Sequence, residues 1–175
     1  MSNLQTTDTV GISFWLISMA MVAAAVFFFI ERDRVASKWK TSLTVCGLIQ
    51  LIAAVHYFYM RGVWVETGET PTVYRYIDWL LTVPLQMIEF YLILAAITVV
   101  AAGVFWRLLI GTLVMLIAGY MGEAGLADAT ICFVIGLAGW GYILYEVFSG
   151  EAGQINAASA NESCQSAYNG MKLIV

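Results

Sequence analysis

The chain has 175 residues, of which 61% are hydrophobic and 11% are charged, and its formal net charge is -4. This composition is too apolar for an ordinary soluble domain and predicts one polytopic membrane domain over residues 1–175. The small, dispersed charge forms no basic patch, which argues against nucleic acid as a partner. Cys46, Cys132 and Cys164 lie far apart without metal-ligand spacing, so we expect free thiols and no metal site.

Five apolar stretches are long enough to cross a bilayer as helices. The first lacks the basic start and the small-residue cleavage site of a signal sequence, so we interpret it as the first spanning helix. A polar loop is predicted after the second helix and a polar connector after the fifth, and the start of a sixth helix is expected after residue 166. The predicted loop covers residues 61–71, and the predicted connector covers residues 149–166. The five predicted helices cover residues 11–30, 41–60, 73–95, 104–121 and 129–148.

The basic residues are distributed unevenly among the loops. Four of the eight lie in the connector between the first two predicted helices, at Arg32, Arg34, Lys38 and Lys40, whereas the next loop has Arg61 alone. The positive-inside rule therefore predicts that the first connector faces the cytoplasm and that the N-terminus lies outside. The third helix then runs from the outer face inward, in a multi-pass protein surrounded by membrane lipid.

The third predicted helix carries polar residues along one face. At about 100° per residue, Glu89 falls roughly 20° from Asp78, and Thr82 about 40°. Arg75 falls about 60° away and Gln86 about 80°. A rise of ~1.5 Å per residue separates Asp78 from Glu89 by about 16 Å, or half of a hydrocarbon core of ~30 Å. Because charges inside a bilayer usually line a bundle interior, we interpret this face as a proton or ion path.

Simpler interpretations of the same residues stay open on sequence grounds. Arg75 and Asp78 have the i, i+3 spacing of a structural ion pair, and Glu89 could extend toward the near membrane face. His56 lies near the outer end of the second helix, at a depth comparable with Asp78. It is either a satisfied interior group or a hydrogen-bond partner that shifts the titration of Asp78.

The run from Arg75 to Glu89, R-Y-I-D-W-L-L-T-V-P-L-Q-x-x-E, resembles the third helix of the microbial rhodopsins of the proteorhodopsin group. The similarity continues through residues 108–125 and 142–145, and in kind across the whole chain. The resemblance implies an all-α, microbial-rhodopsin-like transmembrane bundle of seven helices. About five of those helices and a stub of the sixth are present here, so we expect an incomplete bundle.

The resemblance also implies roles for the polar residues. Asp78 matches the Schiff-base counter-ion and primary proton acceptor, and Arg75 matches the residue that tunes it. Glu89 matches the cytoplasmic proton donor. His56 matches the histidine partner of the counter-ion, which in this family can also meet a neighbouring subunit's tryptophan, here Trp15, in a homo-oligomer.

A retinal pocket is a further implication of the resemblance. Large aromatic side chains in membrane helices are otherwise packing groups or interface anchors. In proteorhodopsins, glutamine at the position of Gln86 accompanies blue absorption. The simpler interpretation is that Gln86 forms a hydrogen bond to a neighbouring helix. The residues implied to line the pocket are Trp79, Thr82, Val83, Gln86, Met115, Gly119, Phe133, Gly136 and Trp140.

One feature of the family is missing. Retinal attaches to a lysine in the middle of the seventh helix, but the lysines here are Lys38, Lys40 and Lys172. The first two lie in the charged connector, and the third matches the start of the sixth helix. No residue of this chain is therefore expected to be the Schiff-base lysine, and the second counter-ion aspartate of the seventh helix is missing too.

Together these features predict a blue-absorbing, light-driven outward proton pump of the bacterial inner membrane, with retinal as cofactor and protons as the transported species. This is a transporter and not an enzyme. A photosensory rhodopsin signalling to a partner is the alternative, but it does not need fast reprotonation by Glu89. An anion pump is disfavoured because Asp78 would repel an anion. A membrane helix fragment without pigment is favoured only by the missing lysine.

Overall fold

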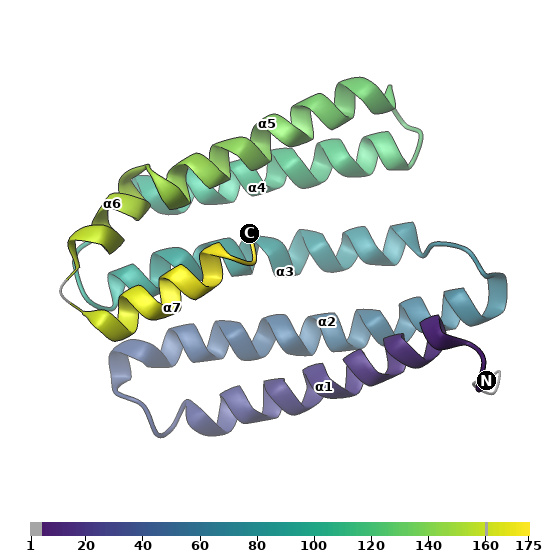
Figure 1. The fold of residues 1–175 in the computed structure, drawn as a ribbon, viewed down its shortest axis with the longest axis horizontal. Coiled ribbons are helices and arrows are strands. Elements are labelled where there is room, and N and C mark those ends of the chain that lie inside the picture. The colour runs from purple at the N-terminus through teal and green to yellow at the C-terminus, as the bar shows by residue number, and fades with distance from the viewer. Residues whose placement is uncertain (1–4, 160) are drawn as a thin grey trace.

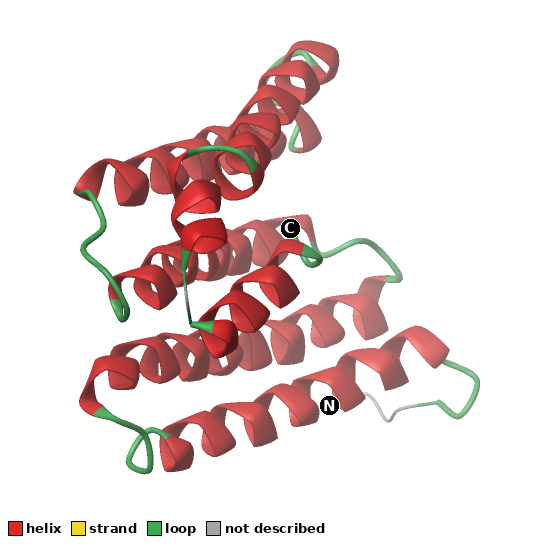
Figure 2. Cartoon of the chain, turned by 60° about the vertical axis from the view of Figure 1, so that its left-hand side comes forward, coloured by secondary structure: helices red, strands yellow, loops and turns green. Residues whose placement is uncertain are grey.

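The computed structural model describes residues 5–159 and 161–175. Regular structure in these ranges is entirely helical, as Figure 2 shows, so the predicted all-α class is confirmed. Within these described ranges, five helices are long and apolar enough to cross a membrane. In chain order the elements are α1 (Thr9–Glu31), the 3-10 turn η1 (Ser37–Trp39), α2 (Lys40–Thr67), α3 (Thr72–Ala95), α4 (Ala102–Glu123), α5 (Ala129–Phe148), α6 (Glu151–Ala158) and α7 (Glu162–Lys172).

The long helices run antiparallel to their neighbours (Figure 1). The 24 residues of α3 give it a length of about 36 Å, enough to span a hydrocarbon core of ~30 Å. The start of α1 and the turns α2–α3 and α4–α5 share one end of the bundle, here called the N-terminal end. The turns α1–α2 and α3–α4, together with α6 and the start of α7, form the opposite, connector end.

Helix α2 extends to Thr67, so the predicted polar loop over residues 61–71 is wrong for its first part. The apolar stretch of α2 ends before Arg61. Beyond the hydrocarbon core of the membrane, however, a helix can continue through charged residues. The helix ends instead at Gly68, whose φ of 70° is a conformation that glycine adopts without strain. The Gly68 N–H donates to the Trp64 carbonyl at 2.8 Å, which closes the last turn.

Asp8 joins the start of α1 to the end of α2. Its carboxylate accepts a hydrogen bond from the Gly11 backbone N–H at 2.8 Å and from the Trp64 indole N–H at 3.1 Å. These two hydrogen bonds lower the pKa of Asp8 below its usual value, and the bond from Gly11 has the larger effect. The cap is therefore ionised at neutral pH, as a helix N-terminus favours.

The predicted connector over residues 149–166 contains the short helix α6 and the first part of α7, so the expected start of a helix after residue 166 is corrected to Glu162. The Asn161 side chain accepts a hydrogen bond from the Cys164 N–H at 2.8 Å, which is an ordinary N-cap. The composition of this segment is polar, which excludes a helix that faces lipid. A polar helix can still form at the end of the bundle, outside the hydrocarbon core.

Helix α3 is the central helix, between α2 and the pair α4–α5, with α7 along its connector half (Figure 1). It contributes more buried residues than any other helix in the described part of the chain, and its buried carboxylates lie among apolar groups. A hydrophobic cluster then fills the connector half of the bundle. Its most enclosed members are Phe90, Leu94, Val104, Leu108, Ile143, Val147, Ala152, Cys164 and Tyr168.

At the connector end, Arg107 of α4 binds two acidic residues from neighbouring helices. Its guanidinium donates to both oxygens of Glu146 at 3.0 and 3.1 Å and to Glu151 at 2.6 Å. The Ala152 N–H donates to the buried Glu146 at 3.2 Å. A Cβ at Gly150 would lie 2.6 Å from the Glu146 Cα, so the corner between α5 and α6 requires glycine. These contacts fix α6 to the long helices.

We expect Arg107→Gln to destabilise the fold by about 3 kcal/mol, because it leaves Glu146 buried without its counter-charge. The matched control is Arg34→Gln, whose exposed pair with Glu31 is worth only about 0.5 kcal/mol. Unfolding by a denaturing detergent in mixed micelles measures both free energies. Equal losses in the two variants would mean that the Arg107 cluster holds nothing together.

Candidate functional site

The polar residues of α3 separate into a group near the N-terminal end and a group deeper in the bundle. Asp78 is 2% exposed and Glu89 is 4% exposed, and Thr82 between them is also buried. The hydroxyl of Thr82 donates to the Asp78 carbonyl at 2.9 Å and so adds no link between the two carboxylates. The carboxylates lie eleven residues apart, about 16 Å along the axis, and therefore form two separate sites.

Asp78 faces His56 across the α2–α3 contact. The distance from His56 Nδ1 to Asp78 Oδ1 is 3.6 Å, which is too long for a hydrogen bond. His56 Nδ1 is instead 2.9 Å from the Ile52 carbonyl, the acceptor it needs when that nitrogen carries the proton. Among the described residues, the buried Oδ1 of Asp78 has no hydrogen-bond partner. One carboxylate oxygen is therefore available for a proton or a cationic group.

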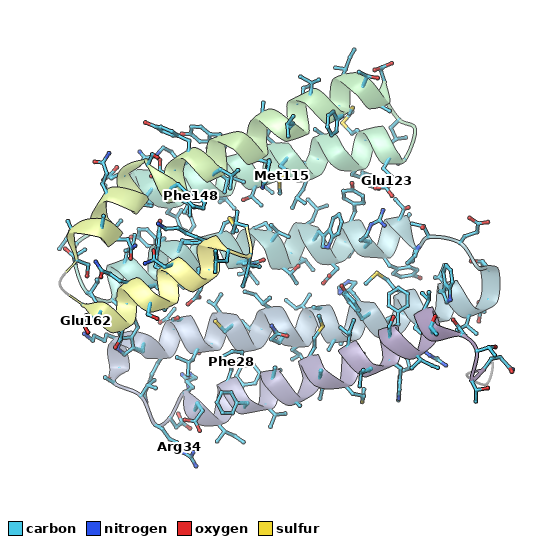
Figure 3. All side chains as sticks on the ribbon, viewed as in Figure 1. Phe28, Arg34, Met115, Glu123, Phe148 and Glu162 are labelled. Atoms are coloured by element: carbon cyan, nitrogen blue, oxygen red, sulfur yellow. The ribbon has the colours of Figure 1, made fainter. Side chains whose placement is uncertain are left out.

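Arg75 binds Glu123 at the end of α4 and not Asp78. Its Nη2 donates to Glu123, which also accepts a hydrogen bond from the Thr72 hydroxyl at 3.1 Å. Figure 3 shows Glu123 beside the start of α3. The structural ion pair with Asp78 is thus absent from the described residues, because a long helical side chain points back toward the helix N-terminus. The guanidinium also lies 5.3 Å from the Trp79 ring centre.

Glu89 is held by the neighbouring helix. The Ser42 hydroxyl of α2 donates to Glu89 Oε1, and Oε2 is buried without a partner in the described part of the chain. A side chain enclosed in this way does not extend to the membrane face, so that alternative is excluded. Ser42 was not among the predicted residues. The only signal for it was a small hydroxyl residue in an apolar helix, which is common between packed membrane helices.

An apolar cleft of about 430 Å³ lies between α3, α4 and α5. It is in the size range of small-molecule sites, which are mostly apolar. Figure 3 shows Met115, one of its lining residues, pointing from α4 toward α3. Seven of the predicted pocket residues line it, namely Trp79, Val83, Met115, Gly119, Phe133, Gly136 and Trp140. Thr82 and Gln86 do not, and four lining residues were not predicted: Tyr76, Leu116, Cys132 and Leu137.

Glycines bring the two helices that form one wall of this cleft into backbone contact. A Cβ at Gly139 of α5 would lie 3.0 Å from the Gly111 carbonyl oxygen and 3.0 Å from the Met115 N of α4. A Cβ at Gly119 would lie 3.0 Å from the Tyr76 hydroxyl oxygen. Small residues allow such close approach of membrane helices. The lining of the cleft therefore combines small residues, Gly119 and Gly136, with aromatic rings.

The described residues fit the hydrocarbon part of a long conjugated ligand and supply a buried carboxylate nearby. They do not supply an amine. Lys38 and Lys40 lie at the connector end, and Lys172 Nζ lies over the Phe148 and Tyr168 rings at 5.2 and 5.4 Å. None of the three lines the cleft.

The described part of the chain has five helices of membrane-spanning length, with two buried carboxylates on the central one and an apolar cleft beside it. This is a bundle of the microbial rhodopsin type. The family model described as "Bacteriorhodopsin-like protein" matches residues 8–175. The chain is 61% identical over 173 residues to the blue-light absorbing proteorhodopsin of Gamma-proteobacterium Hot 75m4, covering 99% of this chain and 68% of that protein. It is 58% identical over 173 residues to the green-light absorbing proteorhodopsin of Gamma-proteobacterium EBAC31A08, covering 99% and 69%.

Among solved structures, the blue light-absorbing proteorhodopsin from Med12 matches with a TM-score of 0.80 at 55% identity, over 95% of this chain and 74% of that one. The chain therefore belongs to the bacteriorhodopsin-like family, within its proteorhodopsin group. It is a multi-pass membrane protein of a family of light-driven ion pumps, not of enzymes. Members of the family bind retinal.

Proposed function

We propose that this chain supplies the first five helices and the start of the sixth of a blue-absorbing, light-driven outward proton pump that uses retinal. The observation that carries the proposal is the pair of buried carboxylates on α3. Each carboxylate has one oxygen without a hydrogen-bond partner among the described residues. Asp78 directly precedes Trp79, which lines the cleft, whereas Glu89 lies further along α3, beyond the cleft residue Val83. Two proton sites at different depths are what directional transfer needs.

In this proposal the walls of the cleft bind retinal and exclude water, with Trp79 and Trp140 among them. Thr82 and Gln86 belong to the same site from the α3 face. Retinal, when bound as a Schiff base to a lysine, would supply light absorption and a photoisomerisation that changes the proton affinity of the Schiff-base nitrogen. The attachment lysine is not one of the lysines of this chain. The pigment therefore needs the rest of the seven-helix bundle, in which the seventh helix supplies that lysine.

The protein's own groups then move the proton. Asp78 balances the positive charge of the cofactor and accepts the proton at its free oxygen, as a positioned base does. His56, with its Nδ1 3.6 Å from Asp78 Oδ1, stabilises one protonation state of Asp78. Arg75, held by Glu123, sets the field on the outer side of Asp78. Glu89 returns a proton from the other side.

The direction of transport follows from the distribution of charge. Arg32, Arg34, Lys38 and Lys40 lie at the connector end, where the structure also places Arg107. The positive-inside rule puts this end in the cytoplasm of a bacterial cell and the N-terminal end outside. Asp78 then faces outward and Glu89 inward.

The test is light-driven proton movement by the complete seven-helix protein, reconstituted with retinal in cells or right-side-out vesicles. We expect illumination to acidify the medium, and a protonophore to remove the change. Alkalinisation of the medium, or an unchanged pH from a coloured protein, would contradict outward proton pumping.

We also propose that the protein forms a homo-oligomer through α1 and α2. Trp15 is 41% exposed and packs on Phe58 of its own chain, with ring centres 5.7 Å apart. The exposed ring is available to meet His56 of a neighbouring subunit, which would couple the subunits to the Asp78 site.

Gln86→Leu should shift the absorption maximum to longer wavelength while proton pumping continues. Gln86 follows the cleft residue Val83 by one turn, so its dipole acts along the polyene without taking part in proton transfer. A visible spectrum and the vesicle assay measure the two effects, with Gln50→Leu on α2 as the matched substitution. An unchanged spectrum would place Gln86 outside the retinal site.

A further inference from the structure

Helix α2 turns two small polar side chains toward α3, the helix that runs beside it (Figure 1). Ser42 and the half-buried Cys46 lie four residues apart, about one turn, so they share a face of the helix. Gly47 lies on a different face, where a Cβ would come within 2.9 Å of the Phe29 ring of α1. Cys46 therefore belongs to the contact of α2 with α3 and not to its contact with α1.

Cys46 reaches the same carboxyl group as Ser42. The Ser42 hydroxyl donates to Glu89 Oε1, and the Cys46 thiol lies within hydrogen-bonding range of the Glu89 side chain. Glu89 is 4% exposed, and its Oε2 has no hydrogen-bond partner among the described residues. None of the ion pairs in the described part of the chain includes Glu89. Its charge is therefore stabilised by uncharged donors, of which the thiol is the second.

The two donors differ in strength, because a hydroxyl is a good hydrogen-bond donor and a thiol is a weak one. Hydrogen bonds donated to a carboxylate favour its ionised form. A carboxyl group with two strong donors would lose its proton too early, whereas one without a second donor would release it slowly. A hydroxyl paired with a thiol therefore suits a group that holds its proton in the dark and releases it once in each cycle.

We propose that Cys46 is a positioning residue for Glu89: its thiol donates to the carboxylate that forms when Glu89 releases its proton, and so sets how fast that release occurs. The inference rests on the proposed function, in which Glu89 reprotonates the chromophore. Cys46 acts through Glu89 and is not a catalytic residue. The S–H proton stays on sulfur throughout, so no bond to sulfur forms or breaks and no oxidant is needed.

The first test uses two substitutions with opposite expected effects, measured by flash photolysis of the retinal-reconstituted seven-helix protein. Cys46→Ala removes the weak donor and should slow the late reprotonation about threefold, the effect of losing one modest hydrogen bond to the anion. Cys46→Ser supplies a stronger donor of nearly the same shape and should speed the same phase about threefold. Slowing by both variants would overturn the inference, because a loss of packing acts in one direction.

Cys164→Ala and Cys164→Ser are the matched controls. Cys164 is 1% exposed and packs against the connector half of α3, but its thiol lies 3.6 Å from the Ile93 carbonyl oxygen and not at Glu89. Both control variants should leave the late phase unchanged. The same pair of opposite effects at position 164 would contradict an action of Cys46 through its contact with Glu89.

The second test observes the thiol itself in the unsubstituted protein, by time-resolved infrared difference spectroscopy. The S–H stretching frequency falls when the thiol donates a stronger hydrogen bond, and a bond to a carboxylate is stronger than one to a neutral acid. We expect the Cys46 band to shift downward while Glu89 is ionised and to recover together with the C=O band of protonated Glu89. Cys46→Ala should remove this shift, whereas Cys132→Ala and Cys164→Ala should retain it. An S–H region that stays unchanged while Glu89 is ionised would overturn the inference.

The comparison with Glu89→Gln separates this inference from the proposed function. In the Glu89→Gln background, Cys46→Ala and Cys46→Ser should have no effect on the late phase, because the group through which Cys46 acts is gone. If Glu89 is not a donor, Glu89→Gln alone leaves the late phase at the wild-type rate, and the pumping role of Glu89 fails. If only the role of Cys46 is wrong, Glu89→Gln slows the late phase, but the Cys46 variants keep the wild-type rate or change it equally in both backgrounds.

Discussion

Asp78→Asn should abolish light-driven proton release while leaving a folded, coloured protein when the full bundle is present. Asparagine keeps the size and polarity of the side chain, so a position that is 2% exposed keeps its packing. Its amide cannot accept the proton that the free Asp78 oxygen is positioned to take. We expect less than about 1% of wild-type release, since proton transfer by a positioned group is typically worth 10²–10⁴-fold.

A pH electrode in a suspension of vesicles measures this release. Asp128→Asn is the matched control, because it makes the same chemical change at the N-cap of α5, where asparagine can also accept the Ile131 N–H bond. That variant should pump normally. Normal pumping by Asp78→Asn would remove Asp78 from the acceptor role.

Glu89→Gln should slow the late reprotonation of the chromophore about a hundredfold and leave the early deprotonation unchanged. Glutamine can still accept the hydrogen bond from Ser42, so the packing of α2 on α3 is kept. It cannot carry a proton. Because Glu89 lies about three turns from Asp78, its loss should not affect the first transfer.

Flash photolysis separates the two phases. Ser42→Ala is the informative companion, because it removes the hydrogen bond and keeps the carboxyl group of Glu89. It should change the late phase by much less than Glu89→Gln. Equal slowing of both phases by Glu89→Gln would indicate a packing defect and not the loss of a donor.

The sequence predicted the helices and the polar face of α3 because both depend on local periodicity. Spacing along one helix places Asp78 and Glu89 in the bundle interior, and the structure buries both. The partners of these residues depend on how neighbouring helices are aligned. Ser42 and Glu123 therefore could not be assigned from the sequence, and neither residue stands out within its own helix.

The ends of helices were predicted less well for a related reason. Apolar composition reports where the lipid ends, so it located the exit at Arg61 but not the extension of α2 to Thr67. The helices α6 and α7 are polar and lie at the membrane end, where hydropathy carries little information. For the cleft, the resemblance supplied seven lining residues, and the structure added Tyr76, Leu116, Cys132 and Leu137 from the contact between helices.

The backbone contact between α4 and α5 has a consequence for how colour can change in such a protein. Gly139 faces the Gly111 carbonyl oxygen and Met115 N, and it does not line the cleft. A single methyl group there would lie 3.0 Å from two backbone atoms of α4, so the two helices must shift by a few tenths of an ångström, and α5 carries Phe133 and Trp140 with it. The width of the cleft, where we propose that retinal binds, is thus controlled from positions outside it, and variants selected for a new absorption maximum need not touch the chromophore.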